Sequence, residues 1–260
     1  MSLLRVSIVQ ADIVQDCVDG NISYYGSLLE RLTGETDLAV IPELFTTGMT
    51  LDVEGPADTN DGKTISAIKK YAKEYGFAIT GSFLASDNGK YYNRAFFITP
   101  EGVEYFYDKR HLFRMADEDR SFSAGVKRLI VNYQGWRICL MVCYDLRFPV
   151  WSRNVGNEYD LLIYVANWPE ARKIPWRALL KARAIENLCY VCGVNRVGVD
   201  SHGFKYHGGS RIYSPKGETL LKADEHEDMI LTETLNIKDL QLFRDKFPAW
   251  MDADDFEIKL

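Results

Sequence analysis

Short apolar runs rich in β-branched residues recur along the chain, separated by polar segments. Runs of four to eight such residues, bounded by turn-forming residues, are typical of buried β-strands. The pattern predicts strands over residues 5–9, 37–41, 77–83, 94–99, 129–133, 136–142, 160–166 and 190–195.

Two stretches between these runs have the spacing of amphipathic helices. In residues 64–75, apolar side chains recur three and four positions apart, and Gly76 suits a helix C-cap. Residues 176–188 repeat the pattern with good helix formers throughout. We therefore expect helices over both stretches.

Three turn segments lie between consecutive predicted strands, in the middle of the chain and in its later third. They are Asp87-Asn88-Gly89, Pro100-Glu101-Gly102 and Pro215-Lys216-Gly217, all typical of hairpins. Hairpins join antiparallel neighbours, so a mixed sheet with helices outside fits better than a purely parallel one. The fold class is therefore α/β. Since neither a repeat nor a linker interrupts the chain, we expect one domain over residues 1–260, with about 248–260 as an acidic and aromatic C-terminal extension.

Composition narrows the possible partners. A net charge of −6 provides no basic field for a phosphate backbone, so nucleic acid is not expected as a partner. No run reaches the roughly 20 apolar residues that span a membrane. The N-terminus lacks the features of a signal peptide, which predicts a cytoplasmic location.

Five cysteines, an odd number, make a disulfide framework improbable. Cys189 and Cys192 have the spacing of a redox or zinc motif, but they stand in an apolar run without a second such pair. Buried thiols are the preferred interpretation of these two.

Cys143 follows an apolar strand and precedes what the sequence predicts to be a turn into a helix. A thiol at a helix N-terminus has its thiolate favoured by unpaired amides and the helix dipole, and the same amides could hold an oxyanion. A buried structural cysteine is the competing interpretation, since many strands end in Cys.

Two charged residues occupy comparable positions. Glu43 ends an apolar strand behind a proline, and Lys109 stands between aromatic runs. Such charges are costly to bury unless they are paired or catalytic. The structural alternatives are that Glu43 caps a helix and that Lys109 pairs with Asp108.

Together, PELF with Glu43, YDKRHLF with Lys109 and MVCYDLRFP with Cys143 resemble the nitrilase superfamily, whose members use a Glu-Lys-Cys triad in this chain order. The likeness continues through ANWPEAR and WRALLKARAIEN to GGSRIYSPKGE. PELFTTGM and HLFRMADED suggest the omega-amidase branch. The resemblance implies a four-layer αββα sandwich with mixed sheets and a homodimer.

The triad residues have complementary chemical roles. Glu43 would take the thiol proton, Cys143 would attack an amide carbonyl, and Lys109 with the Tyr144 amide would stabilise the tetrahedral anion. The resemblance adds Glu118, seven positions before Gly125, as a residue that orients Lys109 or the attacking water. An exposed acidic loop is the alternative for Glu118. Neither a metal nor an organic cofactor is required.

Two further residues concern the substrate. Arg147, four positions after the nucleophile, could bind a substrate carboxylate or could pair with Asp145. Trp168 resembles the family segment that lines the pocket.

The predicted activity is hydrolysis of the terminal amide of a small dicarboxylic acid monoamide, such as 2-oxoglutaramate or 2-oxosuccinamate. Nitrile or N-carbamoyl amide hydrolysis with the same triad is an alternative, as is a non-catalytic scaffold or binding module. Serine-hydrolase chemistry is disfavoured because no GxSxG motif occurs.

Overall fold

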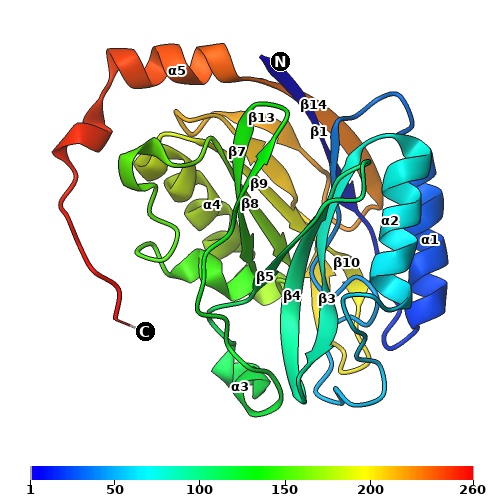
Figure 1. Ribbon diagram of the computed structural model, residues 1–260. Coiled ribbons are helices and arrows are strands. Elements are labelled where there is room, and N and C mark those ends of the chain that lie inside the picture. The colour runs from blue at the N-terminus through cyan, green and yellow to red at the C-terminus, as the bar shows by residue number, and fades with distance from the viewer. Residues whose placement is uncertain (1, 260) are drawn as a thin grey trace.

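The computed structural model describes residues 2–259, and its centre is a pair of six-stranded sheets packed face to face (Figure 1). The first sheet has the strand order β14-β1-β2-β3-β4-β5. In it β1, β2 and β3 run parallel and the other neighbours are antiparallel. Its strands are β1 (Leu3–Gln10), β2 (Leu38–Val40), β3 (Ala78–Asp87), β4 (Lys90–Ile98), β5 (Glu104–Asp108) and β14 (Met229–Asn236).

The second sheet is also mixed, with the order β13-β12-β9-β8-β7-β6 and a parallel centre of β7, β8 and β9. Its strands are β6 (Ile130–Tyr133), β7 (Trp136–Val142), β8 (Leu161–Ala166), β9 (Tyr190–Asn195), β12 (Arg211–Tyr213) and β13 (Thr219–Lys222). A separate small hairpin consists of β10 (Val197–Val199) and β11 (Lys205–His207). The prediction of mixed sheets is confirmed.

Successive residues of the central strands pack on opposite sides of their sheet. In β2, Leu38 and Val40 join the core between the two sheets, whereas Ala39 packs toward the helices outside. Both faces are buried, so such strands read as continuous apolar runs rather than alternating ones. This is why the sequence pattern located them.

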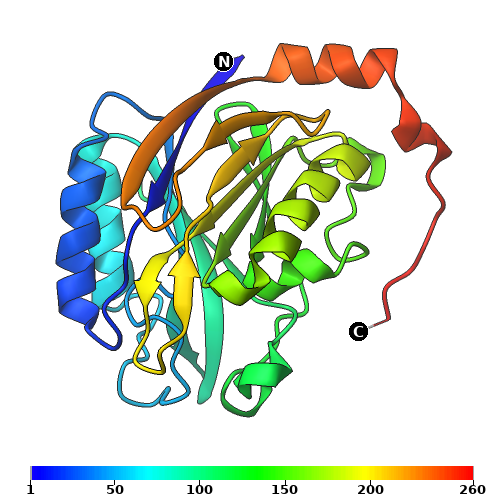
Figure 2. The same cartoon turned by 180° about the vertical axis from the view of Figure 1, so that it is seen from behind.

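Helices cover the outer faces of both sheets (Figures 1 and 2). Helices α1 (Val18–Glu30) and α2 (Lys63–Tyr75) lie against the first sheet, and α4 (Lys173–Asn187) lies against the second. The expected four-layer αββα sandwich is confirmed. Shorter pieces are α3 (Glu118–Ser121) and the 3-10 turns η1 (Arg114–Ala116), η2 (Cys143–Arg147), η3 (Val155–Asn157), η4 (Glu170–Arg172) and η5 (Ala249–Asp252).

The predicted helix boundaries differ from the observed ones in one instructive place. Helix α4 begins at Lys173, ahead of the predicted start at Trp176, and Pro175 lies in its first turn. Proline is tolerated there, since the amides of the first turn have no partner within the helix. The three predicted turns do join antiparallel strand pairs, and Asn88 and Gly89 both have the positive φ that a two-residue hairpin requires.

The last strand returns to the first. β14 pairs antiparallel with β1 along its whole length, from Leu3 opposite Asn236 to Gln10 opposite Met229. Helix α5 (Ile237–Lys246) follows β14 and packs against the second sheet, where its buried Arg244 binds Asp160 just before β8. The 3-10 turn η5 and an extended tail come after it (Figures 1 and 2). Within residues 2–259, no helix combines the length and apolar character needed to cross a bilayer.

Candidate active site

Three strand ends meet between the sheets, and each delivers one of the predicted triad residues. Glu43 follows β2, Lys109 follows β5 and Cys143 follows β7. Lys109 and Cys143 line a cavity of about 330 Å³, together with Tyr144, Arg147 and Trp168. The carboxyl ends of parallel strands are a common place for a ligand site.

The core of the site is a buried cluster of one ammonium and two carboxylates. Lys109 Nζ donates to Glu43 Oε1 at 3.0 Å and to both oxygens of Glu118, at 2.8 and 2.9 Å. All three side chains are at most 1% exposed. Glu118 also accepts a hydrogen bond from the Phe113 amide at 2.6 Å. The cluster is therefore held rigidly out of water.

These contacts exclude the structural alternatives. The structure places Glu118 in the buried cluster, so the exposed-loop interpretation is wrong. Lys109 does not pair with Asp108, because that carboxylate binds Arg94 at 2.6 Å. Glu43 caps no helix, since its Oε2 accepts from the Asn167 amide at 2.5 Å.

Opposing effects act on the Lys109 ammonium. Burial alone would lower its pKa, but the charges of Glu118 and Glu43 outweigh burial and raise the pKa well above the ordinary value. Lys109 is therefore positively charged at any physiological pH, as a group that stabilises an oxyanion must be.

The thiol of Cys143 is in a different electrostatic state from the one the sequence suggested. Burial and the Glu43 carboxylate raise its pKa well above the ordinary value, and Lys109 offsets this only in part. The expected helix is a single 3-10 turn of five residues, η2. The prediction of a thiolate favoured by a helix dipole is therefore wrong. To act as a nucleophile, this thiol would need a base to take its proton.

The backbone at Cys143 is strained. Its φ is 45°, in the left-handed region that L-residues with a Cβ rarely adopt. Asp145 holds this bend by accepting from the Val142 amide at 3.1 Å and the Tyr107 hydroxyl at 2.7 Å. It also accepts from the His111 amide at 2.9 Å. Asp145 thus joins the backbone on both sides of Cys143 to β5 and to the loop that follows it.

The predicted substrate residues lie together in one wall. The Arg147 guanidinium stacks over the Trp168 ring at 5.2 Å from the centroid, rather than pairing with Asp145. The Tyr144 ring meets Phe113 edge-on at 4.9 Å. The Tyr144 amide is the second of the η2 turn, where backbone N–H groups have no partner within the turn.

Three residues of the site were missed by the sequence analysis. Asn93 donates to Glu43 Oε1 at 2.7 Å and lies 3.4 Å from Glu118 Oε1. Asn167 binds the other oxygen of Glu43, and Arg172 lines the cavity. Asn93 stands directly before the strand predicted over residues 94–99, and Asn167 and Arg172 stand within ANWPEAR.

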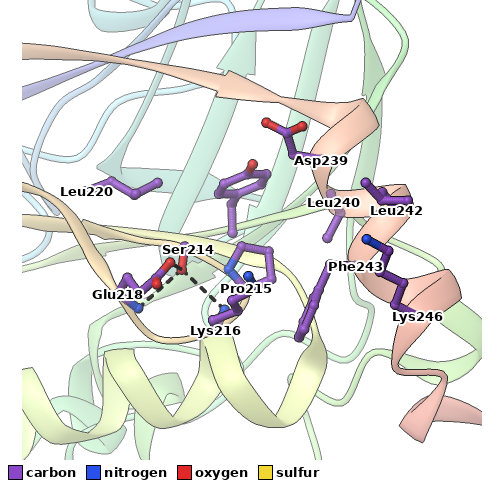
Figure 3. A pocket seen from close by; sticks show the side chains of 11 residues that line it. Ser214, Pro215, Lys216, Glu218, Leu220, Asp239, Leu240, Leu242, Phe243 and Lys246 are labelled. Atoms are coloured by element: carbon purple, nitrogen blue, oxygen red, sulfur yellow. Dashed lines mark hydrogen bonds between the residues drawn. The ribbon is translucent and has the colours of Figure 1, made fainter.

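A second groove, of about 380 Å³, lies between α5 and the turn that joins β12 to β13 (Figure 3). Its Ser214 hydroxyl is bonded to the Glu218 carboxylate at 3.0 Å and accepts from the amides of Lys216 and Glu218. The hydroxyl and the Glu218 carboxylate both lie within the turn, where their hydrogen bonds stabilise its backbone. The cavity at Cys143 is therefore the candidate active site.

Comparison with known proteins agrees with this fold and site. The family model for carbon-nitrogen hydrolases matches residues 5–245, so the chain belongs to the carbon-nitrogen hydrolase family, within the nitrilase superfamily. It falls in the omega-amidase branch. Omega-amidase YafV of Escherichia coli K12 is 44% identical over 255 residues, covering 98% of each chain.

Two further proteins extend the comparison. The 2-oxoglutaramate amidase of Bacillus subtilis 168 is 32% identical, covering 95% of this chain and 96% of its own. A CN-hydrolase superfamily protein from Xanthomonas campestris, whose crystal structure has an arsenic adduct in the active site, superposes with a TM-score of 0.97 at 42% identity over the full length of both chains. Both support an enzyme that hydrolyses carbon–nitrogen bonds.

Proposed function

We propose that this enzyme hydrolyses the terminal amide of a small dicarboxylic acid monoamide, such as 2-oxoglutaramate or 2-oxosuccinamate, through a cysteine thioester. The observation that carries the proposal is the buried Lys109 ammonium, bonded to Glu43 and Glu118 and facing the same cavity as Cys143. The similarity to an omega-amidase and to a 2-oxoglutaramate amidase supports the substrate class.

The first half of the reaction forms the thioester. Glu43 takes the proton of the neutral thiol as Cys143 Sγ bonds to the amide carbon, and the carbonyl oxygen becomes an oxyanion. Lys109 Nζ and the Tyr144 amide stabilise that oxyanion. Protonated Glu43 then donates to the leaving nitrogen, the carbon–nitrogen bond breaks, and ammonia departs.

The second half releases the acid. Glu43, again a carboxylate, takes a proton from a water molecule whose oxygen attacks the thioester carbon. The carbon–sulfur bond breaks and the thiolate regains the proton from Glu43. Glu118 and Asn93 are positioning residues in this scheme, since they hold Lys109 and Glu43 rather than the substrate.

The test is ammonia release from 2-oxoglutaramate, a matching nitrile and an N-carbamoyl amino acid, with wild type and Cys143→Ala compared. Turnover of 2-oxoglutaramate that is fastest of the three and lost in Cys143→Ala supports the proposal. Faster turnover of the nitrile or the carbamoyl compound would overturn the substrate class. The absence of turnover with every substrate would instead favour the scaffold alternative.

We also propose that two copies associate as a homodimer. Large apolar side chains stay exposed along the C-terminal segment, including Phe247 at 55% and Met251 at 67%. Surfaces of this kind often mark protein contacts. Light scattering on the full chain and on Phe247→Asp tests this: a dimeric mass that falls in the variant supports it, and a monomeric wild type contradicts it.

A further inference from the structure

Two guanidinium groups line the cavity, although the sequence analysis singled out only one of them. Arg147 ends η2, which begins at Cys143, and Arg172 ends η4. Neither side chain has an ion-pair or hydrogen-bond partner among residues 2–259. By contrast, the buried Arg94, Arg196 and Arg244 each bind an aspartate.

Aromatic rings hold both groups in place. Arg147 stacks over Trp168 at 5.2 Å, and Arg172 stacks over Phe113 at 4.9 Å. Trp168 joins the two, because its indole Nε1–H donates to the Arg172 carbonyl at 2.7 Å. Stacking engages the face of a guanidinium and leaves its N–H edges free, which is the geometry that carboxylates bind.

The two aspartates that line the same cavity have other hydrogen-bond or ion-pair partners. Asp200 accepts from the Tyr206 hydroxyl at 2.8 Å and from the amides of His202 and Phe204. Asp117 pairs with Arg120 at 3.2 Å. Neither carboxylate makes an ion pair with Arg147 or Arg172, so both guanidinium groups keep N–H donors for a ligand.

We propose that Arg172 and Arg147 together clamp the end of the substrate remote from the amide, and that Arg172 is a specificity-determining residue. The ligand chemistry that fits is a carboxylate with an adjacent 2-oxo group, whose coplanar oxygens can accept from two planar donors. This inference rests on the proposed amidase function and names the part of the pocket that selects its substrate. A cavity of about 330 Å³ limits the ligand to a small linear molecule.

The experiment compares 2-oxoglutaramate with pentanamide, which has the same chain length and no charge, in wild type, Arg147→Gln, Arg172→Gln and Arg172→Lys. Arg31→Gln is the matched control, since it removes an exposed guanidinium at the C-cap of α1. For Arg172→Gln we expect kcat/KM for 2-oxoglutaramate to fall about 10- to 100-fold, mainly through KM, because charge-assisted hydrogen bonds are lost. The loss with pentanamide should be far smaller. Arg172→Lys should keep more of the kcat/KM for 2-oxoglutaramate than Arg172→Gln but less than wild type, since an ammonium cannot make the bidentate contact.

Inhibition by 2-oxoglutarate gives a second readout that does not depend on chemistry at the amide. Its inhibition constant should rise in Arg172→Gln and stay constant in Arg31→Gln. An unchanged inhibition constant in Arg172→Gln would contradict the clamp.

The outcomes separate this inference from the function on which it rests. If wild type shows no preference for 2-oxoglutaramate over pentanamide, the proposed function itself fails. If wild type has the preference and Arg172→Gln keeps it, the clamp is wrong and the function stands. Equal losses with both substrates would mean that Arg172 only supports the fold of the wall, which also overturns the clamp.

Discussion

Lys109 and Glu118 form a two-pronged ion pair, in which one Nζ lies 2.8 and 2.9 Å from the two oxygens of one carboxylate, with both side chains buried. Within residues 2–259, no hydrogen bond joins Glu118 to Cys143. We therefore expect the main effect of Glu118 on catalysis to act through Lys109, whose charge and position it helps to determine.

Replacing Glu118 with Gln should lower kcat while leaving KM nearly unchanged, because the oxyanion partner loses its orientation. It should also shift the alkaline limit of activity to lower pH, since Glu118 is the largest of the influences that raise the pKa of Lys109. The measurement is a kcat profile against pH. The same change at the exposed Glu101 is the control. An alkaline limit that does not move would contradict this role.

The same ion pair has a consequence for stability. A raised lysine pKa adds stability that is complete below the unfolded value of 10.5 and is lost only as the pH rises through the folded value. Alkaline unfolding should therefore begin at lower pH in Glu118→Gln than in wild type.

Glu43→Gln should change turnover and thiol reactivity in opposite directions. Loss of the base stops turnover, but removal of a carboxylate that raises the pKa of Cys143 lets that pKa fall while Lys109 stays charged. Each unit of decrease gives about tenfold more thiolate at neutral pH. The rate of iodoacetamide alkylation at pH 7 should therefore rise.

This measurement needs a Cys17→Ser background. Cys17 is exposed at the start of α1, so iodoacetamide would also alkylate its thiol. The other three thiols are fully buried. In wild type, Cys17 should react faster than Cys143. Slower alkylation in Glu43→Gln would mean that Glu43 activates the thiol even toward the reagent.

Tyr107→Phe should destabilise the segment that carries the nucleophile. The Tyr107 hydroxyl donates to Asp145 and accepts from Trp151 Nε1 at 2.9 Å. Its loss leaves buried polar groups unpaired, which costs about 1–3 kcal/mol. Thermal unfolding should show a lower midpoint, with kcat reduced. The same change at Tyr24, whose hydroxyl meets Asp228 near the surface, should have little effect. Equal shifts in the two variants would argue against a special role for the Asp145 network.

Cys143→Gly should be more stable than Cys143→Ala, by about 1 kcal/mol, because only glycine adopts a φ of 45° without strain. Chemical denaturation of the two inactive variants measures the difference. At Cys139, within strand β7, the order should reverse, since glycine weakens a regular strand. A Cys143→Gly variant less stable than Cys143→Ala would show that the bend is not strained.

The sequence predicted the site best where the signal was local. Glu43, Lys109 and Cys143 each follow an apolar or aromatic run, so their positions at strand ends could be recognised along the chain. Asn93 and Asp145 act through partners distant in sequence, at Glu43 and at Tyr107. Spacing alone carries no such information. For Asp145, the nearby Arg147 even suggested the wrong partner.

The sequence did not predict helix α1, and the physical reason is a different one. Gly20 and Gly26 lower the helix propensity of the segment. At Gly26 an added Cβ would lie 2.6 Å from the Tyr71 ring of α2, so glycine is needed for the two helices to approach. The close packing that stabilises α1 therefore requires a glycine, and glycine lowers the helix propensity from which α1 could have been predicted.

The burial of Glu43, Lys109 and Glu118 also sets catalytic activity against the stability of the fold. Taking three ionised groups out of water carries a large desolvation cost, which their mutual attraction repays only in part, and well-packed apolar replacements of such groups are often more stable. We therefore expect engineered or evolving versions of this chain to gain heat resistance most readily when the trio becomes apolar together, at the loss of all catalysis. We expect these three buried charges to serve turnover rather than folding.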